Sequence, residues 1–103
     1  MLTNGQRPTA IFAGGYYFAL DVYAAVTAAG LRLPNSLSVI AVDDPPSASH
    51  LTPPLTTVRQ PLIELGRAAL TALFERISGA SRRLDTRQLQ GELVVRQSTS
   101  APV

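Results

Sequence analysis

Two adjacent carboxylates, Asp43 and Asp44, directly follow the apolar segment Ser38–Val42 and are the residues of this sequence best placed for chemistry. Such a pair could accept hydrogen bonds from ligand hydroxyls, bind a hard cation, or act in acid and base catalysis. It could equally cap a turn that leads into Pro45. A cation site needs several oxygen ligands, and neither an Asp-x-Asp motif nor a glutamate cluster accompanies the pair, so we expect no metal. The ligand and turn interpretations both stay open here.

A second candidate surface is the segment from Gly14 to Phe18, where two glycines and three aromatic residues follow the apolar run Thr9–Ala13. The glycines lack both the Gly-x-Gly-x-x-Gly spacing and the Gly-Lys-Ser/Thr ending of phosphate loops, so that interpretation is weak. Tyr16 or Phe18 could stack on a ligand ring, or the aromatic residues could pack in the core or an interface.

Nucleophilic catalysis finds no support in the residues available. His50 is the only histidine, and the chain has neither a cysteine nor a Gly-x-Ser-x-Gly motif to pair with it. We therefore expect His50 to be a surface or packing residue and the chain not to be an enzyme. The lack of cysteine excludes disulfides and thiolate metal sites, and no cofactor is expected.

Composition and charge argue for a globular protein without its own nucleic-acid surface. The chain is 46% hydrophobic and 16% charged, which predicts a packed core, and its net charge of +2 attracts phosphates little. Five arginines in the last third lack interleaved aromatic residues and are expected to be solvated: Arg76, Arg82, Arg83, Arg87 and Arg96. No recognition helix can be placed, and no secretory signal or membrane span of ~20 apolar residues is found. We expect a cytoplasmic protein that has no membrane partner.

An α/β fold is predicted to position the candidate residues. The runs Thr9–Ala13 and Ser38–Val42 read as strands, and the second, continuously apolar, is expected to be covered on both faces. Apolar residues spaced by three and four between them predict a helix near Phe18–Ala29, which Gly30 should end. Strand, helix and strand form a crossover unit, which implies a parallel pair. Parallel sheets bind ligands at the carboxyl ends of their strands, where both candidate surfaces lie.

The second half of the chain begins with a proline-rich segment. Five of the eight prolines lie between Asp43 and Pro61, which predicts an ordered loop or extended crossing and no helix or central strand. The spacing of apolar residues then predicts an amphipathic helix over Leu62–Ile77, ended by Gly79. The rest is predicted as a polar loop over Ser78–Gln90, a strand over Glu92–Arg96 and a tail over Ser98–Val103.

Four blocks of sequence, in this order and spacing, resemble the lactose and galactose repressor family. They are Pro8–Ala13, Ala28–Pro34, Leu37–Asp44 and, most specifically, Leu51–Pro61 with Glu64–Arg67; Leu93–Thr99 resembles the family's closing strand. The resemblance extends from about Arg7 to Pro102. It implies part of a type I periplasmic-binding-protein-like fold.

The resemblance also implies a division of the chain between two lobes. Residues 8–60 would belong mostly to the C-terminal lobe, residues 61–90 to a helix and loop of the other lobe, and residues 91–103 to a closing strand and tail. The family's N-terminal helix-turn-helix domain and the first half of its sensor are not among these 103 residues. The second helix should then lack its natural partner, so we expect the isolated chain to self-associate or unfold readily.

Site residues follow from the same resemblance. Asp43 matches the carboxylate that contacts ligand hydroxyls, and Gln60 and Leu62 fall near the pocket. Gly15 and Tyr16 stand where the family usually has Asn-Asp, so the contact made by that asparagine is absent and Gly15 can offer only its backbone. Either the pocket takes a different ligand or it no longer functions. The dimer surface would include Leu20, Tyr23, Ser47, His50 and Leu51.

The function implied is that of a regulatory module in a transcriptional repressor. Its partners would be a small-molecule effector, a sugar or related polyol, and a second copy in a homodimer, with operator DNA bound only through the missing helix-turn-helix domain. Two alternatives stay open: a fragment of a sugar-binding transport protein, and a truncated, non-functional remnant. The sequence upstream would distinguish the three.

Overall fold

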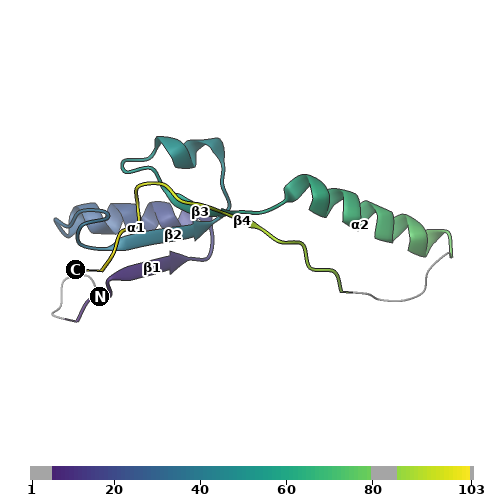
Figure 1. Cartoon of the computed structure of the whole chain (residues 1–103), viewed down its shortest axis with the longest axis horizontal. Helices are drawn as coiled ribbons and strands as arrows, with labels where there is room; N and C mark the ends of the chain where they lie inside the picture. The colour runs from purple at the N-terminus through teal and green to yellow at the C-terminus, as the bar shows by residue number, and fades with distance from the viewer. Residues whose placement is uncertain (1–5, 80–85, 103) are drawn as a thin grey trace. The chain divides into compact units, whose positions relative to one another are not determined.

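A computed structural model describes residues 6–79 and 86–102 of the chain. The elements follow in the order β1 (Ala10–Ala13), α1 (Tyr16–Ala28), β2 (Ser38–Val42), the 3-10 helix η1 (Pro46–His50), β3 (Thr56–Arg59), α2 (Leu62–Ile77) and β4 (Glu92–Val94) (Figure 1). The predicted α/β fold is confirmed. The chain divides into two compact units, Met1–Arg59 with Leu93–Val103, and Gln60–Glu92.

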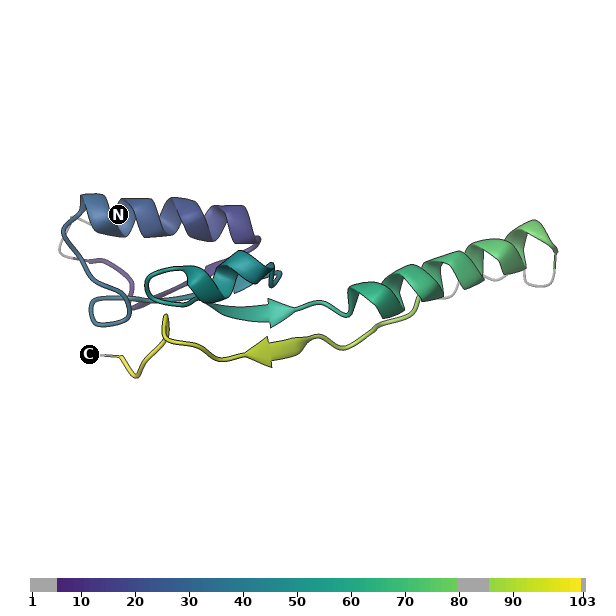
Figure 2. The same ribbon diagram turned by 90° about the horizontal axis from the view of Figure 1, so that it is seen from above.

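The sheet has the strand order β1-β2-β3-β4, and its first three strands are parallel. Ala10 to Ala13 pair with Ser38 to Ala41, and Ile40 to Val42 pair with Thr56 to Val58. The arrows of β3 and β4 point in opposite directions in Figure 2. The carboxyl ends of β1, β2 and β3 therefore share one edge, which we call the carboxyl edge.

The proline-rich segment contains two regular elements, so the prediction of a loop without helix or central strand is wrong. η1 occupies Pro46–His50, and β3 lies between β2 and β4. The interval between Pro54 and Pro61 is free of proline, and every residue of β3 therefore keeps the N–H donor that a central strand needs. Thr56, Thr57 and Val58 are also β-branched, which favours the extended conformation.

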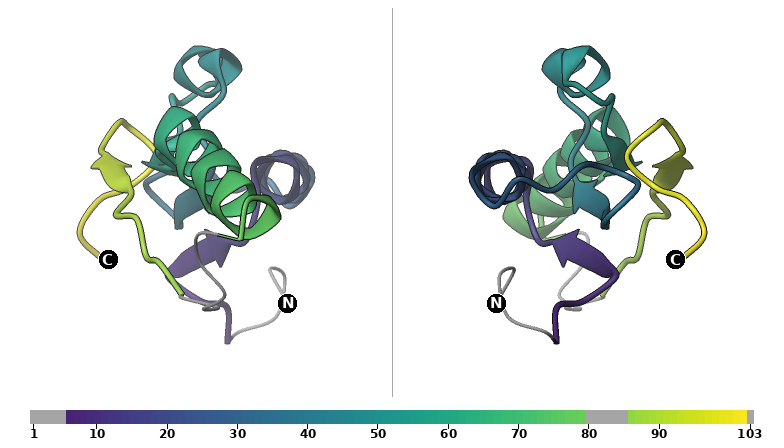
Figure 3. Two further views of the ribbon diagram at one scale, coloured as in Figure 1. Left: turned by 90° about the vertical axis from the view of Figure 1, so that its right-hand side faces the viewer. Right: turned by 90° about the vertical axis from the view of Figure 1, so that its left-hand side faces the viewer.

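The core of the first unit lies between α1 and one face of the sheet (Figure 3). It consists of Ala13, Ala19, Val26, Leu37, Val39, Ala41, Ala48 and Leu55. Many of these side chains are small, which allows the helix to approach the strands closely. The opposite face is not covered in this way: Phe12 is 62% exposed, and Ile40 and Val42 are half-buried. The predicted cover of both faces of β2 is therefore met only in part: Val39 and Ala41 on the α1 side are buried, the residues on the other face are half-buried, and none is exposed.

The C-terminal tail connects β2 to β3. The Ser98 side chain is fully buried; its Oγ donates to the Val39 carbonyl at 2.6 Å and accepts from the Thr56 N–H at 2.8 Å. The Val39 N–H donates to the Ser98 carbonyl at 2.9 Å. One tail residue thus satisfies both backbone groups of Val39 in β2 and the N–H of Thr56 in β3, at the end where the pairing of these two strands begins.

The second unit contains α2, which follows Pro61 and ends before Gly79, whose φ of +78° suits glycine. The helix has an apolar face, yet none of its residues is buried. Leu62, Ile63, Leu70, Leu73, Phe74 and Ile77 are all more than half exposed. Among the described residues, no helix has the length and apolar character required to cross a membrane.

Candidate functional site

Asp43 lies at the carboxyl edge directly after β2, in an unusual backbone conformation. Its φ is +81°, in the left-handed region that residues other than glycine rarely adopt, although Asp and Asn do so more often than most. Its N–H donates to the Val58 carbonyl at 2.9 Å, which extends the β2–β3 ladder by one bond. Strained residues of this kind are concentrated at functional sites in proteins.

Asp44, the second carboxylate, forms ion pairs with two arginines. Its Oδ2 accepts hydrogen bonds from Arg59 Nε at 3.0 Å and Nη2 at 2.8 Å, and Arg96 binds Oδ1 through Nη1 at 2.7 Å and Oδ2 through Nη2 at 3.1 Å. The Asp44 side chain is only 4% exposed. The Arg96 hydrogen bonds, with a smaller contribution from Arg59, lower the pKa of Asp44 to about 2, so it remains ionised and is unsuited to acid and base work near neutral pH.

Arg96 was expected to be solvated with the other arginines of the last third, and for this residue the prediction is wrong. Its side chain is 17% exposed and also donates to the Leu55 carbonyl at 2.7 Å. The partner Asp44 lies 52 residues away along the chain, so no local pattern could reveal the pairing. We call Asp44, Arg59 and Arg96 together the arginine clamp.

At the end of β1, Gly15 and Tyr16 begin α1. Gly15 is the N-cap residue, and no side chain caps the helix, which leaves backbone N–H groups of the first turn as the polar groups of this segment. The Tyr16 hydroxyl hydrogen-bonds Ser47 Oγ at 2.7 Å and so ties the start of α1 to η1. The Tyr16 ring packs edge-on against Tyr17 and partly against the core.

The remaining predicted ligand residues fall in the second unit. Gln60 follows β3, and Leu62 is the first residue of α2, with 70% of its surface exposed. The structure thus brings Gly15, Tyr16 and Asp43 into one unit and leaves Gln60 and Leu62 in the other. That these two join the same pocket stays a prediction.

The residues predicted for the dimer surface lie on α1 and around η1. Leu20 is half-buried, while Ser47 and His50 are exposed. Tyr23 donates to the Pro53 carbonyl at 2.7 Å, and burial raises the pKa of its hydroxyl to about 12. Leu51 packs partly against the core. Tyr23 and Leu51 therefore already contribute to the fold of the first unit.

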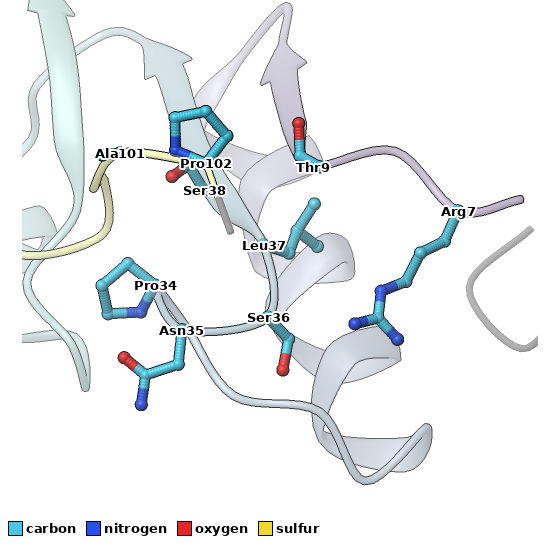
Figure 4. Close-up of a pocket in the computed structure, with 9 residues that line it drawn as sticks. All are labelled: Arg7, Thr9, Pro34, Asn35, Ser36, Leu37, Ser38, Ala101 and Pro102. Atoms are coloured by element: carbon cyan, nitrogen blue, oxygen red, sulfur yellow. The ribbon is translucent and has the colours of Figure 1, made fainter.

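Two hollows in the first unit lie away from the carboxyl edge. One, of ≈ 250 Å³, opens at the amino ends of β1 and β2, where Arg7 extends toward Ser36 and the tail residues Ala101 and Pro102 form one wall (Figure 4). The other, of ≈ 410 Å³, lies between the end of α1 and the loop at Thr52 and Pro53. Neither includes a predicted ligand residue.

Sequence reasoning missed the arginine clamp and the buried Ser98. Asp44, Arg59 and Ser98 each lie within a block that carries the family resemblance, as does Arg96. Opposite charges in three separate blocks were the available signal for an ion-pair cluster.

Comparisons with known proteins agree with the resemblance. Residues 1–99 match the family of the periplasmic binding protein-like domain. The ribose operon repressor of Haemophilus influenzae is 39% identical over 98 residues, which cover 95% of this chain and 30% of that protein. The transcriptional repressor PurR of Mannheimia succiniciproducens is 40% identical over 98 residues, covering 95% and 29%. The chain thus spans less than a third of the length of these curated relatives.

Solved structures show the same similarity. A LacI family transcriptional regulator from Enterococcus faecalis with bound ribose superposes with a TM-score of 0.83 at 33% identity, covering 96% of this chain and 37% of that one. The lac repressor dimer bound to operator and an anti-inducer gives a TM-score of 0.82 at 33% identity, covering 91% and 32%. The chain therefore belongs to the family of periplasmic binding protein-like domains, and its similarity to regulators of the lactose repressor family confirms the resemblance found in its sequence.

Proposed function

We propose that this chain is the C-terminal part of an effector-sensing and dimerising domain in a transcriptional regulator, and that it binds a small neutral sugar or polyol at the carboxyl edge. The observation that carries the proposal is Asp43, an acidic residue held at φ +81° where three parallel strands end. A carboxylate at this place can accept hydrogen bonds from two neighbouring hydroxyls of a sugar.

Three solved structures of similar regulators support the choice of ligand class. Solved regulators from Enterococcus faecalis and Enterococcus faecium contain bound ribose, and another contains cellobiose. In this chain the end of β1 contributes backbone N–H groups and aromatic rings in place of a side-chain amide. We infer a pocket that holds the sugar mainly through Asp43 and stacks an apolar sugar face on an aromatic ring.

In the whole protein, the bound ligand would act at a distance on DNA binding. Binding would shift an equilibrium between two states of a cytoplasmic homodimer and thereby change its affinity for operator DNA, a coupling between sites without catalysis. The dimer surface would include Leu20 and His50, and DNA would be bound by a separate helix-turn-helix domain. The lac repressor dimer bound to operator is the structural precedent.

Thermal unfolding of the intact protein that contains this chain tests the ligand class. We expect D-ribose or cellobiose to raise the melting temperature, because a ligand at 100 times its Kd stabilises the folded state by about 2.7 kcal/mol. Asp43→Asn should reduce or abolish the shift, whereas Asp21→Asn, at an exposed carboxylate within α1, should not. An equal shift in the wild type and in Asp43→Asn would contradict the assignment.

A further inference from the structure

The left-handed conformation of Asp43 requires an explanation, because side chains other than glycine disfavour it. The hydrogen bond from the Asp43 N–H to the Val58 carbonyl holds the amino side of the residue. On its carboxyl side the next residue is Asp44, whose carboxylate receives four hydrogen bonds from two guanidinium groups. Asp43 therefore lies between two fixed points.

The second fixed point is itself anchored to β3. Arg96 donates from Nη1 to both Asp44 Oδ1 and the Leu55 carbonyl, each at 2.7 Å, and its backbone N–H donates to Thr56 Oγ1 at 2.9 Å. Burial of a charge is costly unless it is paired, and a hydrophobic cluster of the same volume is often as stable. A gain in folding stability alone therefore gives no reason for a buried, fully paired carboxylate at Asp44. Its place next to the strained Asp43 indicates that it fixes the local backbone geometry.

The clamp also occupies a special place along the chain. Arg59 is the last residue of the first unit before the chain enters the second, and Arg96 follows soon after the chain returns at Leu93. Asp44 consequently binds both chain segments where they join the first unit. The Arg59 side chain is 50% exposed against 17% for Arg96, so Arg96 is the firmer of the two anchors.

We propose that Asp44 is a positioning residue that, through Arg96 and Arg59, holds Asp43 in the left-handed conformation in which its carboxylate meets the ligand. The inference rests on the proposed function for its ligand, but the backbone part of it can be tested without any ligand. If Asp44 positions Asp43 in this way, the affinity of the site depends on a residue that does not itself contact the sugar.

The first measurement is structural. Crystal structures of the ligand-free intact protein, wild type and Asp44→Asn, report the φ angle of Asp43 directly. We expect the variant to lose the ordered left-handed conformation at Asp43 while β2 stays paired with β3. An unchanged, well-ordered φ near +81° in Asp44→Asn would overturn the proposal, whether or not the protein binds a sugar.

The second measurement is calorimetric titration with D-ribose of the wild type, Asp44→Asn, Asp43→Asn and the double variant, well below their melting temperatures. Asp44→Asn should weaken binding about tenfold or more, and it should cost nothing further once Asp43 has been replaced. The matched control is Val26→Ala, which removes buried side-chain volume from the core without touching the clamp and should leave the affinity unchanged. Additive losses, or an unchanged affinity in Asp44→Asn, would show a purely structural role.

Arg59→Gln provides a milder variant in case Asp44→Asn does not fold. Because Arg59 is half exposed, the variant should retain its fold and lose a few-fold in affinity, with increased disorder at Asp43 in its crystal structure. An ordered, unchanged Asp43 in this variant and in Arg96→Gln would contradict the clamp. If the wild type does not bind D-ribose, the proposed ligand fails, and the φ angles still decide the positioning role.

Discussion

The two units of this chain show opposite relations between sequence pattern and burial. In the first unit, α1 covers its strands, and residues such as Ala19 and Val39 are completely buried. In the second, α2 has the clearer apolar face, and none of its residues is buried. Apolar periodicity therefore predicts that a helix forms and which face needs covering, but burial also requires a partner surface. The apolar face of α2 is uncovered in the described structure.

The largest effect expected from this difference is seen in a pair of leucine truncations. Leu55→Ala should destabilise the 103-residue chain by about 2–5 kcal/mol, because Leu55 is fully buried, whereas Leu70→Ala on exposed α2 should cost less than about 1 kcal/mol. Chemical denaturation of both variants over a range of protein concentrations measures this. Similar losses at both positions would mean that α2 is covered in solution, for example by a second copy of the chain.

The next effect concerns the arginine clamp. Asp44→Asn should lower the free energy of unfolding by about 2–3 kcal/mol, because it leaves Arg96 largely buried without its charge partner. Glu64→Gln, at an exposed position on α2, should leave the free energy of unfolding nearly unchanged. The folded pKa of Asp44, about 2, lies below its ordinary value of 3.8, so its stabilising contribution is complete above about pH 4 and is lost as the pH falls toward 2.

Chemical denaturation of the wild type and of Asp44→Asn between pH 7 and pH 2 checks both the size of the Asp44 contribution to the free energy of unfolding and the direction in which it changes with pH. The gap between their unfolding free energies should remain constant down to about pH 4 and shrink below it. A gap that widens on acidification, or one confined to the region above pH 5, would show that another group is responsible.

A smaller effect is expected in the tail. Ser98→Ala should cost about 1–3 kcal/mol, because it leaves the Val39 carbonyl and the Thr56 N–H without their buried hydroxyl partner. Ser100→Ala, at an exposed position of the same tail, is the matched control and should cost less than about 0.5 kcal/mol. Equal stabilities for the two variants would show that the tail detaches in solution.

Much of the fold could be predicted because its signals are local. The apolar run before Gly14 and the three- and four-residue spacing over Leu62–Ile77 predict β1 and α2 without reference to the rest of the chain. β3 is not predicted because prolines lie on both sides of it, although the proline-free interval between Pro54 and Pro61 is long enough for a strand.

The site was only partly predictable, for a different physical reason. The position of Asp43 at a strand end follows from the βαβ pattern, but its left-handed φ depends on what surrounds it. The Asp44–Arg96 pair joins residues 52 apart, and Ser98 reaches Val39 across 59. Contacts at such separations are set by the packing of the sheet and leave no periodic trace in the sequence.

The most direct test of the proposed function is a crystal structure of the intact protein with D-ribose. The proposed function predicts that the sugar lies at the carboxyl edge, with the Asp43 carboxylate within about 2.6–3.2 Å of one or two of its hydroxyls and Asp44 still bound to Arg59 and Arg96. A sugar found elsewhere, such as in the hollow beside Arg7, or at the carboxyl edge without contact to Asp43, would contradict it.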